Sequence, residues 1–174
     1  MQAPAIEDHC NTRICAQTAQ DLMTSPVKTA YEGWSVKMLM DFFIRNGISG
    51  APVIAGDGEL VGVVTLSDVV KFENMAPREK ETLARASWYG EYTGLELTEE
   101  ELRRLLQNAD SNCTVNQIMT HQVIQVDLSA PILEIATIMR DHHIHRVFVA
   151  ENRKVVGVVS TTSILNGLID SCAC

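Results

Sequence analysis

The chain has 174 residues, a formal net charge of −8 at pH 7 and 46% hydrophobic residues. This length and apolar content suffice for one compact domain or two small ones, and no uncharged apolar run reaches the roughly 18 residues of a membrane-spanning helix. A net negative chain is a poor match for nucleic acid, whose phosphates are neutralised by clustered Lys and Arg. The N-terminus lacks the basic start and apolar stretch of a secretory signal, so we expect a cytoplasmic protein without a nucleic-acid or membrane partner.

The strongest feature of the sequence is an internal duplication. Residues 59–68 read ELVGVVTLSD and residues 154–163 read KVVGVVSTTS, with their glycines 95 positions apart. Residues 22–24 (LMT) match residues 118–120 (IMT) at an offset of 96, so one residue is lost near the turn at residues 56–58. A period this long excludes a solenoid of many short repeats and predicts two copies of one small domain.

In chain order, residues 1–17 are expected to form an irregular lead-in, followed by a short helix at residues 18–23. Ser25-Pro26 ends that helix, because the residue before proline avoids helical backbone angles. Ser35 is a candidate N-cap for a longer helix, whose apolar side chains recur at i, i+3, i+4 and i+7 and which ends at Asn46-Gly47. The other elements of the first copy are an extended piece at 27–30, hairpin strands at 48–54 and 60–65, and a closing helix at 69–72 opened by Ser67 or Asp68.

The second copy is expected to repeat this order of strand, helix, strand, strand and helix. Its elements are a short strand at 123–126, a helix capped by Ser129 with Pro131 in its first turn, hairpin strands at 144–150 and 155–160, and a closing helix at 164–169.

A helical insert is expected between the two copies. Pro77 fits the first position of one helix, and a capping box at residues 98–101 opens another. We therefore predict an α/β chain in five parts. These are the lead-in (1–17), a first repeat (18–72), the insert (73–113), a second repeat (114–170) and a tail (171–174).

The paired motifs resemble the cystathionine-β-synthase (CBS) domain, present twice as a Bateman module. The first copy reads L-M-T, G-I-S-G-A-P-V and G-E-L-V-G-V-V-T-L-S-D, and the second reads I-M-T, H-I-H-R-V-F-V and K-V-V-G-V-V-S-T-T-S. The resemblance implies two β-α-β-β-α repeats packed around a pseudo-two-fold axis in a stand-alone, non-catalytic regulatory protein. It also implies an adenosine ligand (AMP, ADP, ATP or S-adenosylmethionine) in the cleft between the repeats, a homodimer, and signalling to a protein target by a change of shape.

The end of the strand at residues 60–65 carries the first candidate site. Thr65 ends the strand and Asp68 follows about one helical turn later, so a hydroxyl and a carboxylate can lie beside backbone N–H groups. A carboxylate can accept both hydrogen bonds of a ribose diol, or it can cap the helix, and both interpretations remain open. Ser160 and Ser163 stand at these positions in the second copy, where a hydroxyl cannot make the charged contact, so we favour the cleft containing Asp68. The resemblance assigns further ligand contacts to Thr29, Ala51, Pro52 and Val53.

Residues 142–149, His-His-Ile-His-Arg-Val-Phe-Val, carry the second candidate site. The resemblance places His145 and Arg146 where basic residues meet ligand phosphates. Arg146 can clamp a phosphate bidentately, and His145 would add pH sensitivity. Asp68 in one copy and Arg146 in the other are thus expected to be complementary halves of one nucleotide site. Alternatively, the histidines are solvated surface, or His143 and His145 share one face of a strand and bind a metal.

The cysteines leave a further alternative open. There are five, an odd number without a C-x-x-C pair, which is typical of reduced cytosolic thiols. A redox- or metal-responsive switch could use them with the histidine cluster, and a ligand-free dimerisation or docking module is the other rival function. No G-x-S-x-G or Walker motif supports an enzyme. The cysteines are Cys10, Cys15, Cys113, Cys172 and Cys174.

Overall fold

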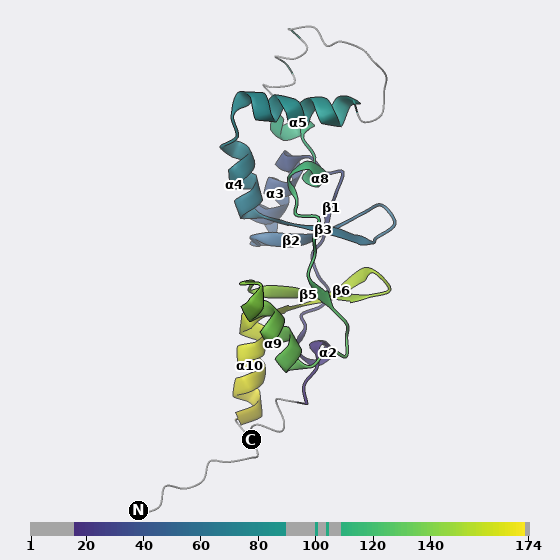
Figure 1. Cartoon of the computed structure of the whole chain (residues 1–174), viewed down its shortest axis with the longest axis vertical. Helices are drawn as coiled ribbons and strands as arrows, with labels where there is room; N and C mark the ends of the chain where they lie inside the picture. The colour runs from purple at the N-terminus through teal and green to yellow at the C-terminus, as the bar shows by residue number, and fades with distance from the viewer. Residues whose placement is uncertain (1–15, 90–99, 101–103, 105–108, 173–174) are drawn as a thin grey trace, which may run out of the picture. The chain divides into compact units, whose positions relative to one another are not determined.

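The structure is a computed structural model that describes residues 16–89, 100, 104 and 109–172. These residues form two compact units. Unit 1 is built from the described parts of Met1–Val27 and Ile124–Cys174, and unit 2 from those of Lys28–Val123. Each unit contains one three-stranded sheet with helices (Figure 1), as the α/β prediction requires.

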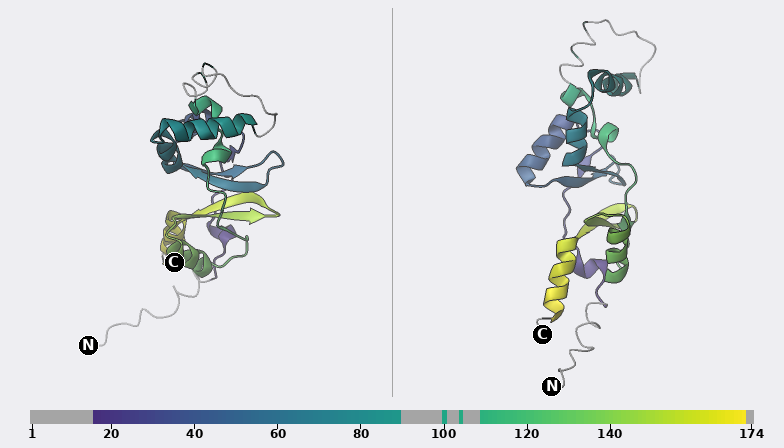
Figure 2. Two further views of the ribbon diagram at one scale, coloured as in Figure 1. Left: turned by 45° about the horizontal axis from the view of Figure 1, so that its top comes forward. Right: turned by 60° about the vertical axis from the view of Figure 1, so that its left-hand side comes forward.

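Unit 2 places its two main helices on a sheet with the strand order β1-β2-β3. Strand β1 pairs in parallel with β2, and β2 pairs antiparallel with β3. Helices α3 and α4 pack against each other, as Figures 1 and 2 show, and Leu39, Val64 and Phe72 are fully buried in the core. The elements are β1 (Ala30–Tyr31), α3 (Val36–Asn46), β2 (Gly50–Ile54), β3 (Leu60–Thr65), α4 (Leu66–Glu73), α5 (Pro77–Tyr89), α7 (Ala109–Asn112) and α8 (Val115–Ile118).

Unit 1 repeats this architecture with the strand order β4-β5-β6. Strand β4 pairs in parallel with β5, and β5 pairs antiparallel with β6. The apolar stripe of α9, which includes Ile135 and Met139, is buried together with Val147 and Val159 of the hairpin. The elements are α2 (Ala19–Leu22), β4 (Gln125–Val126), α9 (Ile132–Asp141), β5 (Arg146–Glu151), β6 (Lys154–Ser160) and α10 (Thr161–Cys172).

The compact units differ from the sequence repeats in one segment each. Residues 18–24 begin the first repeat but belong to unit 1, where the Thr24 N–H donates to the Val158 carbonyl at 2.9 Å. Residues 114–120 begin the second repeat but belong to unit 2, where the Thr120 N–H donates to the Val63 carbonyl at 2.9 Å. The first segment of each repeat therefore packs with the remainder of the other repeat. Residues 18–24 belong to unit 1, and residues 114–120 belong to unit 2. Unit 2 is continuous in sequence, and unit 1 is not.

The two repeated glycines make room for these segments. A Cβ at Gly157 would lie 2.8 Å from Met23 Cγ and 2.9 Å from Met23 Cβ, and closer still to the sulfur. A Cβ at Gly62 would lie 3.1 Å from both Cγ and Cε of Met119, and again closer to the sulfur. A glycine inside a strand often marks such a close approach. The approaching group here is a methionine side chain.

Several predicted helix starts are wrong. Helix α4 follows β3 without a break, so its N-cap is Thr65 and not Ser67 or Asp68. The N-cap of α9 is Pro131, with no side-chain cap bond from Ser129. The predicted capping box at 98–101 lies outside the described residues except for Glu100. Within the part of the chain that the structure describes, no helix is long and apolar enough to cross a membrane.

Candidate functional site

In unit 2, the polar candidates meet where β3 ends and α4 begins, here called the unit-2 edge. Gly50, the first residue of β2, pairs with Thr65, the last residue of β3. The Leu66 N–H donates to the Ser49 carbonyl at 2.9 Å, which holds the start of α4 beside the start of β2. The unit-2 edge thus consists of Ser49, Gly50, Thr65 and Asp68.

The carboxylate of Asp68 forms the capping box of α4. Its Oδ2 accepts hydrogen bonds from the Thr65 N–H at 2.9 Å and from Thr65 Oγ1 at 2.7 Å. Its Oδ1 lies 3.5 Å from Lys71 Nζ, and the carboxylate side chain is 12% exposed. A carboxylate offers about four acceptor positions, so capping occupies Asp68 without using all of them. The capping interpretation is confirmed, and the ribose contact remains a prediction.

The other candidates in unit 2 lie close to this edge, and most are buried. Ala51 and Val53 belong to the hydrophobic core, and Pro52 is fully buried between them. Thr29 directly precedes β1, whose first residue Ala30 pairs with Val53. Only Thr29 of these four candidates keeps a partly exposed side chain, so the other three can shape the edge but offer no exposed polar group.

In unit 1, the corresponding unit-1 edge lies where β6 ends and α10 begins. Arg146 pairs with Ser160 across the hairpin, and the Thr161 N–H donates to the His145 carbonyl at 3.1 Å. The side chains of His145 and Arg146 are exposed. The structure therefore brings the two basic residues beside the N-terminus of a 12-residue helix, where backbone N–H groups favour an anion.

Ser163 reproduces the cap of Asp68 without its charge. The Ser163 N–H donates to Ser160 Oγ at 3.1 Å, and the Ser160 N–H donates to Ser163 Oγ at 3.2 Å. The two hydroxyl oxygens lie 3.0 Å apart. The N-terminus of α10 is thus capped with no negative side chain, whereas the N-terminus of α4 carries a carboxylate.

The same capping arrangement opens two more helices. The Thr18 N–H donates to Asp21 Oδ2 at 2.8 Å before α2, and the Thr114 N–H donates to Gln117 Oε1 at 2.9 Å before α8. The pKa of Asp21 is lowered because the backbone N–H and then the hydroxyl of Thr18 donate to its carboxylate. An acceptor three residues after a hydroxyl residue therefore recurs at the starts of α2, α4, α8 and α10, and its presence at Asp68 does not by itself indicate a ligand.

The predicted placement of two histidines on one strand face is wrong. Strand β5 begins only at Arg146, and His143 lies in the turn before it with a φ of 53°. Gly47, the equivalent residue 96 positions earlier, has a φ of 61° and ends α3. His143 thus takes the left-handed conformation that ends α9. Among the described residues, no group of three or more His, Cys, Asp or Glu side chains could hold a metal.

Cys113 is the one cysteine whose side chain the structure describes, so the proposed redox or metal role of the cysteines is considered at this residue. Cys113 is fully buried in the core of unit 2. Cys172 is the last residue of α10, and Cys10, Cys15 and Cys174 lie outside the described residues.

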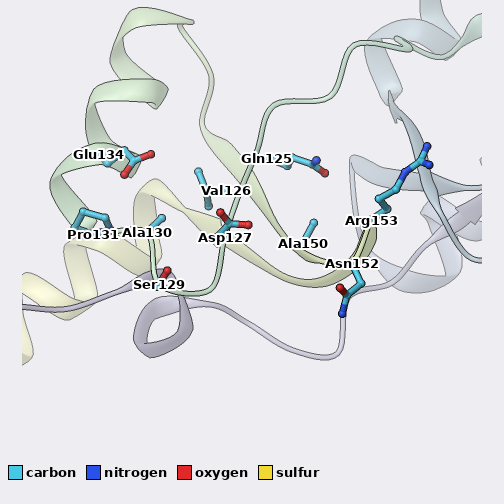
Figure 3. A pocket seen from close by; sticks show the side chains of 10 residues that line it. All are labelled: Gln125, Val126, Asp127, Ser129, Ala130, Pro131, Glu134, Ala150, Asn152 and Arg153. Carbon is cyan, nitrogen blue, oxygen red and sulfur yellow. The ribbon is translucent and has the colours of Figure 1, made fainter.

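Sequence reasoning missed a pocket in unit 1. It has a volume of about 430 Å³ and lies between β4, the start of α9 and the hairpin turn after β5 (Figure 3). Its rim includes Asp127, Glu134 and Arg153. Because these residues come from separate segments and form no known motif, no signal in the sequence could have found the pocket. It lies at the opposite end of β5 from Arg146.

The fold and the two helix-terminal edges define a pair of CBS units. The model of the CBS domain family matches residues 19–74 and residues 115–170, and the chain belongs to this family. The chain is similar to an uncharacterized protein of Methanocaldococcus jannaschii, with 30% identity over 160 residues, which cover 86% of this chain and 90% of that protein.

Solved CBS structures resemble the chain over most of its length. The CBS domain of a membrane protein from Sphaerobacter thermophilus has a TM-score of 0.66 and 26% identity over 90% of this chain and 91% of that chain. The protein CBSX2 in complex with AMP has a TM-score of 0.64 and 18% identity, covering 88% and 96%. A CBS domain pair in complex with 5′-methylthioadenosine and S-adenosylmethionine has a TM-score of 0.59 and 24% identity, covering 87% and 94%.

Proposed function

We propose that the chain is a regulatory module that binds an adenine nucleotide and signals by a change of shape. The observation that carries this proposal is the unit-1 edge, where His145 and Arg146 stand beside a helix N-terminus capped without a negative charge. The complexes of related CBS pairs with AMP and with S-adenosylmethionine support an adenosine compound as the ligand class.

The phosphate role belongs to the unit-1 edge. Arg146 has a planar fork of donors that matches two phosphate oxygens. The first N–H groups of α10 lie at the positive end of the helix dipole, which favours a bound anion. His145 adds a donor on each ring nitrogen when it is protonated. Ser160 and Ser163 contribute hydroxyls that can reorient toward a phosphate oxygen.

The ribose role belongs to the unit-2 edge. Asp68 keeps acceptor positions beyond those used by Thr65. The Lys71 side chain is 74% exposed, so its ion pair with Asp68 Oδ1 can break at little cost in free energy. Two hydroxyls of a ribose can then donate to the carboxylate. Thr29 is the remaining partly exposed polar candidate near this edge, and Ala51, Pro52 and Val53 support it from the core.

Titration calorimetry with AMP and adenosine tests both roles. Arg146→Ala is expected to weaken AMP binding about tenfold, the loss of one charge-assisted contact, and to leave adenosine binding unchanged. Arg140→Ala is the matched control, because it removes the same charge from the same unit at a residue already paired with Asp141 at 2.8 Å.

The ribose contact is tested with Asp68→Ser. This variant copies the cap that Ser163 makes in unit 1, so α4 keeps an N-cap acceptor while the carboxylate is lost. We expect weaker binding of both AMP and adenosine, with an unchanged far-ultraviolet circular dichroism spectrum. Wild-type affinities for AMP in both Arg146→Ala and Asp68→Ser would refute the site assignment.

The identity of the ligand is tested by thermal shift. We expect AMP, ADP, ATP or S-adenosylmethionine to raise the melting temperature, because a ligand that binds only the folded state stabilises it. No stabilisation by any of them at millimolar concentration would favour the ligand-free docking module.

We also propose that the chain forms a homodimer through α10. Three apolar side chains on this helix are exposed: Leu165 (58%), Leu168 (45%) and Ile169 (62%). The helix carries one charged residue, Asp170, so two copies can meet along it with little like-charge repulsion. Light scattering after size exclusion should show a dimer that Leu165→Glu with Ile169→Glu converts to a monomer. The control is Ile44→Glu, which changes an exposed residue of α3.

A further inference from the structure

Residues 17–24, here called the arm, lie in unit 1 as an inserted peptide does in its binding partner. Ala19 and Leu22 of the arm belong to the buried core of this unit, and α2 packs against α10 (Figure 2). The backbone of the arm bonds to an acceptor surface, residues 128–132 and Val158, which comes far later in the sequence. These bonds run from the N–H of Ile132 to the carbonyl of Gln17 (3.0 Å), from Ala19 to Ala130 (2.8 Å), from Gln20 to Leu128 (3.0 Å), from Thr24 to Val158 (2.9 Å) and from Val158 to Thr24 (3.2 Å).

Unit 2 binds the equivalent segment, residues 113–120, through the same set of bonds. Every donor and acceptor lies at the matching position of the other copy. The bonds run from the N–H of Val36 to the carbonyl of Cys113 (3.0 Å), from Val115 to Trp34 (2.8 Å), from Asn116 to Glu32 (3.0 Å), from Thr120 to Val63 (2.9 Å) and from Val63 to Thr120 (2.9 Å). The two segments are connected to their units by different courses of the chain and still bind alike. Binding therefore depends on the motif and its acceptor surface, and not on the connection between them.

The arm is held less completely than its counterpart in unit 2. Gln17 Oε1 is buried and has no hydrogen-bond partner among the described residues. A buried acceptor without a partner lacks the bond that it makes with water once the segment is released. The matching residue in unit 2 is Cys113, which is fully buried, and Met119 there is 7% exposed whereas Met23 of the arm is partly exposed. Release of the arm thus costs less free energy than release of its counterpart.

We propose that a second copy of this chain supplies the arm, so that two chains exchange residues 17–24 and form a dimer. Each acceptor surface then keeps all of its bonds, because the arm of one chain takes the place of the arm of the other. The competitor is the chain's own arm, whose effective concentration is about millimolar when the connection is short and flexible. Residues 25–27 are this connection. Exchange is therefore expected when chains fold together at about that concentration.

The test is a disulfide that joins two chains only after exchange. Thr24 and Val158 donate to each other's carbonyls, so their Cα atoms lie about 5.5 Å apart, within the range of a disulfide. Thr24→Cys chains and Val158→Cys chains are mixed in urea, refolded together at about 1 mM and oxidised. We expect a covalent dimer, joined between the two introduced cysteines as peptide mass spectrometry shows. All chains carry Leu165→Glu and Ile169→Glu, which removes the contact proposed along α10, and serine in place of every cysteine except Cys113.

The matched control uses the same two positions in unit 2. Thr120 and Val63 also donate to each other's carbonyls, so a mixture of Thr120→Cys and Val63→Cys chains has the same geometry. This mixture should give about fivefold less covalent dimer, since its segment lacks the unpartnered acceptor. Gln17→Leu removes that acceptor from the arm, so adding it to the first mixture should lower the yield of dimer about threefold.

Hydrogen exchange of the unmodified chain measures release of the arm without any substitution. The amides of Ile132 and Val158, which donate to the arm, should be less protected than those of Val36 and Val63, which donate to its counterpart.

Any one of four results would overturn the proposal. These are no disulfide between chains in the Thr24 and Val158 mixture, equal yields from the two mixtures, an unchanged yield with Gln17→Leu, and equal protection of the matched amides. All four are measured without nucleotide, so they leave the proposed function to its own calorimetric test.

Discussion

The contact between Gly157 and Met23 gives the sharpest prediction about stability. In Gly157→Ala the new Cβ would lie within 2.9 Å of Met23 Cβ and within 2.8 Å of Met23 Cγ. Met23 Cβ cannot move away by side-chain rotation, because it is bonded directly to the Cα of its own residue. The clash is therefore relieved only if the backbone of residues 18–24 moves. Overpacking of this kind costs about 1–3 kcal/mol, and the smaller entropy of the unfolded alanine chain offsets up to about 1 kcal/mol. We expect a net loss of about 1–2 kcal/mol in the free energy of unfolding.

Gly62→Ala is the matched comparison in unit 2. The atoms near its Cβ are Cγ, Sδ and Cε of Met119, which are the flexible part of the side chain. Met119 can rotate away without moving its backbone, so the expected loss is below about 1 kcal/mol. The structure thus predicts unequal costs for the same substitution at the same position of the two repeats.

Urea denaturation of the full chain measures both costs. The two tryptophans, Trp34 and Trp88, both lie in unit 2, so tryptophan fluorescence follows unit 2 and far-ultraviolet circular dichroism follows both units. Gly157→Ala should lower the midpoint by circular dichroism, and adding Met23→Ala should return part of the loss as a coupling of about 1 kcal/mol. Gly62→Ala costing as much as Gly157→Ala, or a double variant that is simply additive, would refute the reasoning.

Three further substitutions test the local geometry. His143→Gly should raise the free energy of unfolding by about 1 kcal/mol, because His143 has a positive φ angle of 53°; a urea midpoint at or below the wild type's would contradict this. Ser163→Asp should strengthen the cap of α10 by about 0.5 kcal/mol and weaken AMP binding in calorimetry, and unchanged AMP affinity would argue against phosphate at this edge. The pKa of Asp21 lies below its usual 3.8, so its contribution to stability is present above that pH and is lost as the pH falls through the lower folded value. Asp21→Asn should therefore lose less stability on acidification, measured by urea midpoints, and a loss equal to the wild type's would contradict the capping role.

The elements within each copy followed from short-range patterns. The apolar spacing of residues 36–43 predicted α3, and the strand predicted at 60–65 is β3, Leu60–Thr65. The helix starts at Thr65 and Ser160 were misplaced, because the closing helix needs no loop after its strand. The hydroxyl residue that ends the strand is already the N-cap, which a pattern of apolar residues does not indicate.

Two features depended on contacts that no local pattern contains. Residues 18–24 and 114–120 carry almost the same motif, so nothing in either segment tells which unit accepts it. The turn at His143 could have been inferred from its alignment with Gly47, but the metal alternative placed His143 and His145 in a strand. In the candidate site, Thr65 and Asp68 lie where β3 ends, and His145 and Arg146 lie at the start of β5 beside the end of β6. The capping bonds of Asp68 required coordinates, and one site shared by Asp68 and Arg146 stays a prediction.

The interrupted course of unit 1 sets an order for folding during synthesis. All of unit 2 is present once residue 123 has left the ribosome, whereas residues 18–24 must wait for partners that are made about a hundred positions later. Contacts of such long sequence separation form slowly, because the intervening chain must first be ordered. A newly made chain therefore passes through a stage in which its start is unpaired while its middle is complete, and a folded middle shortens the path over which the two ends must find each other.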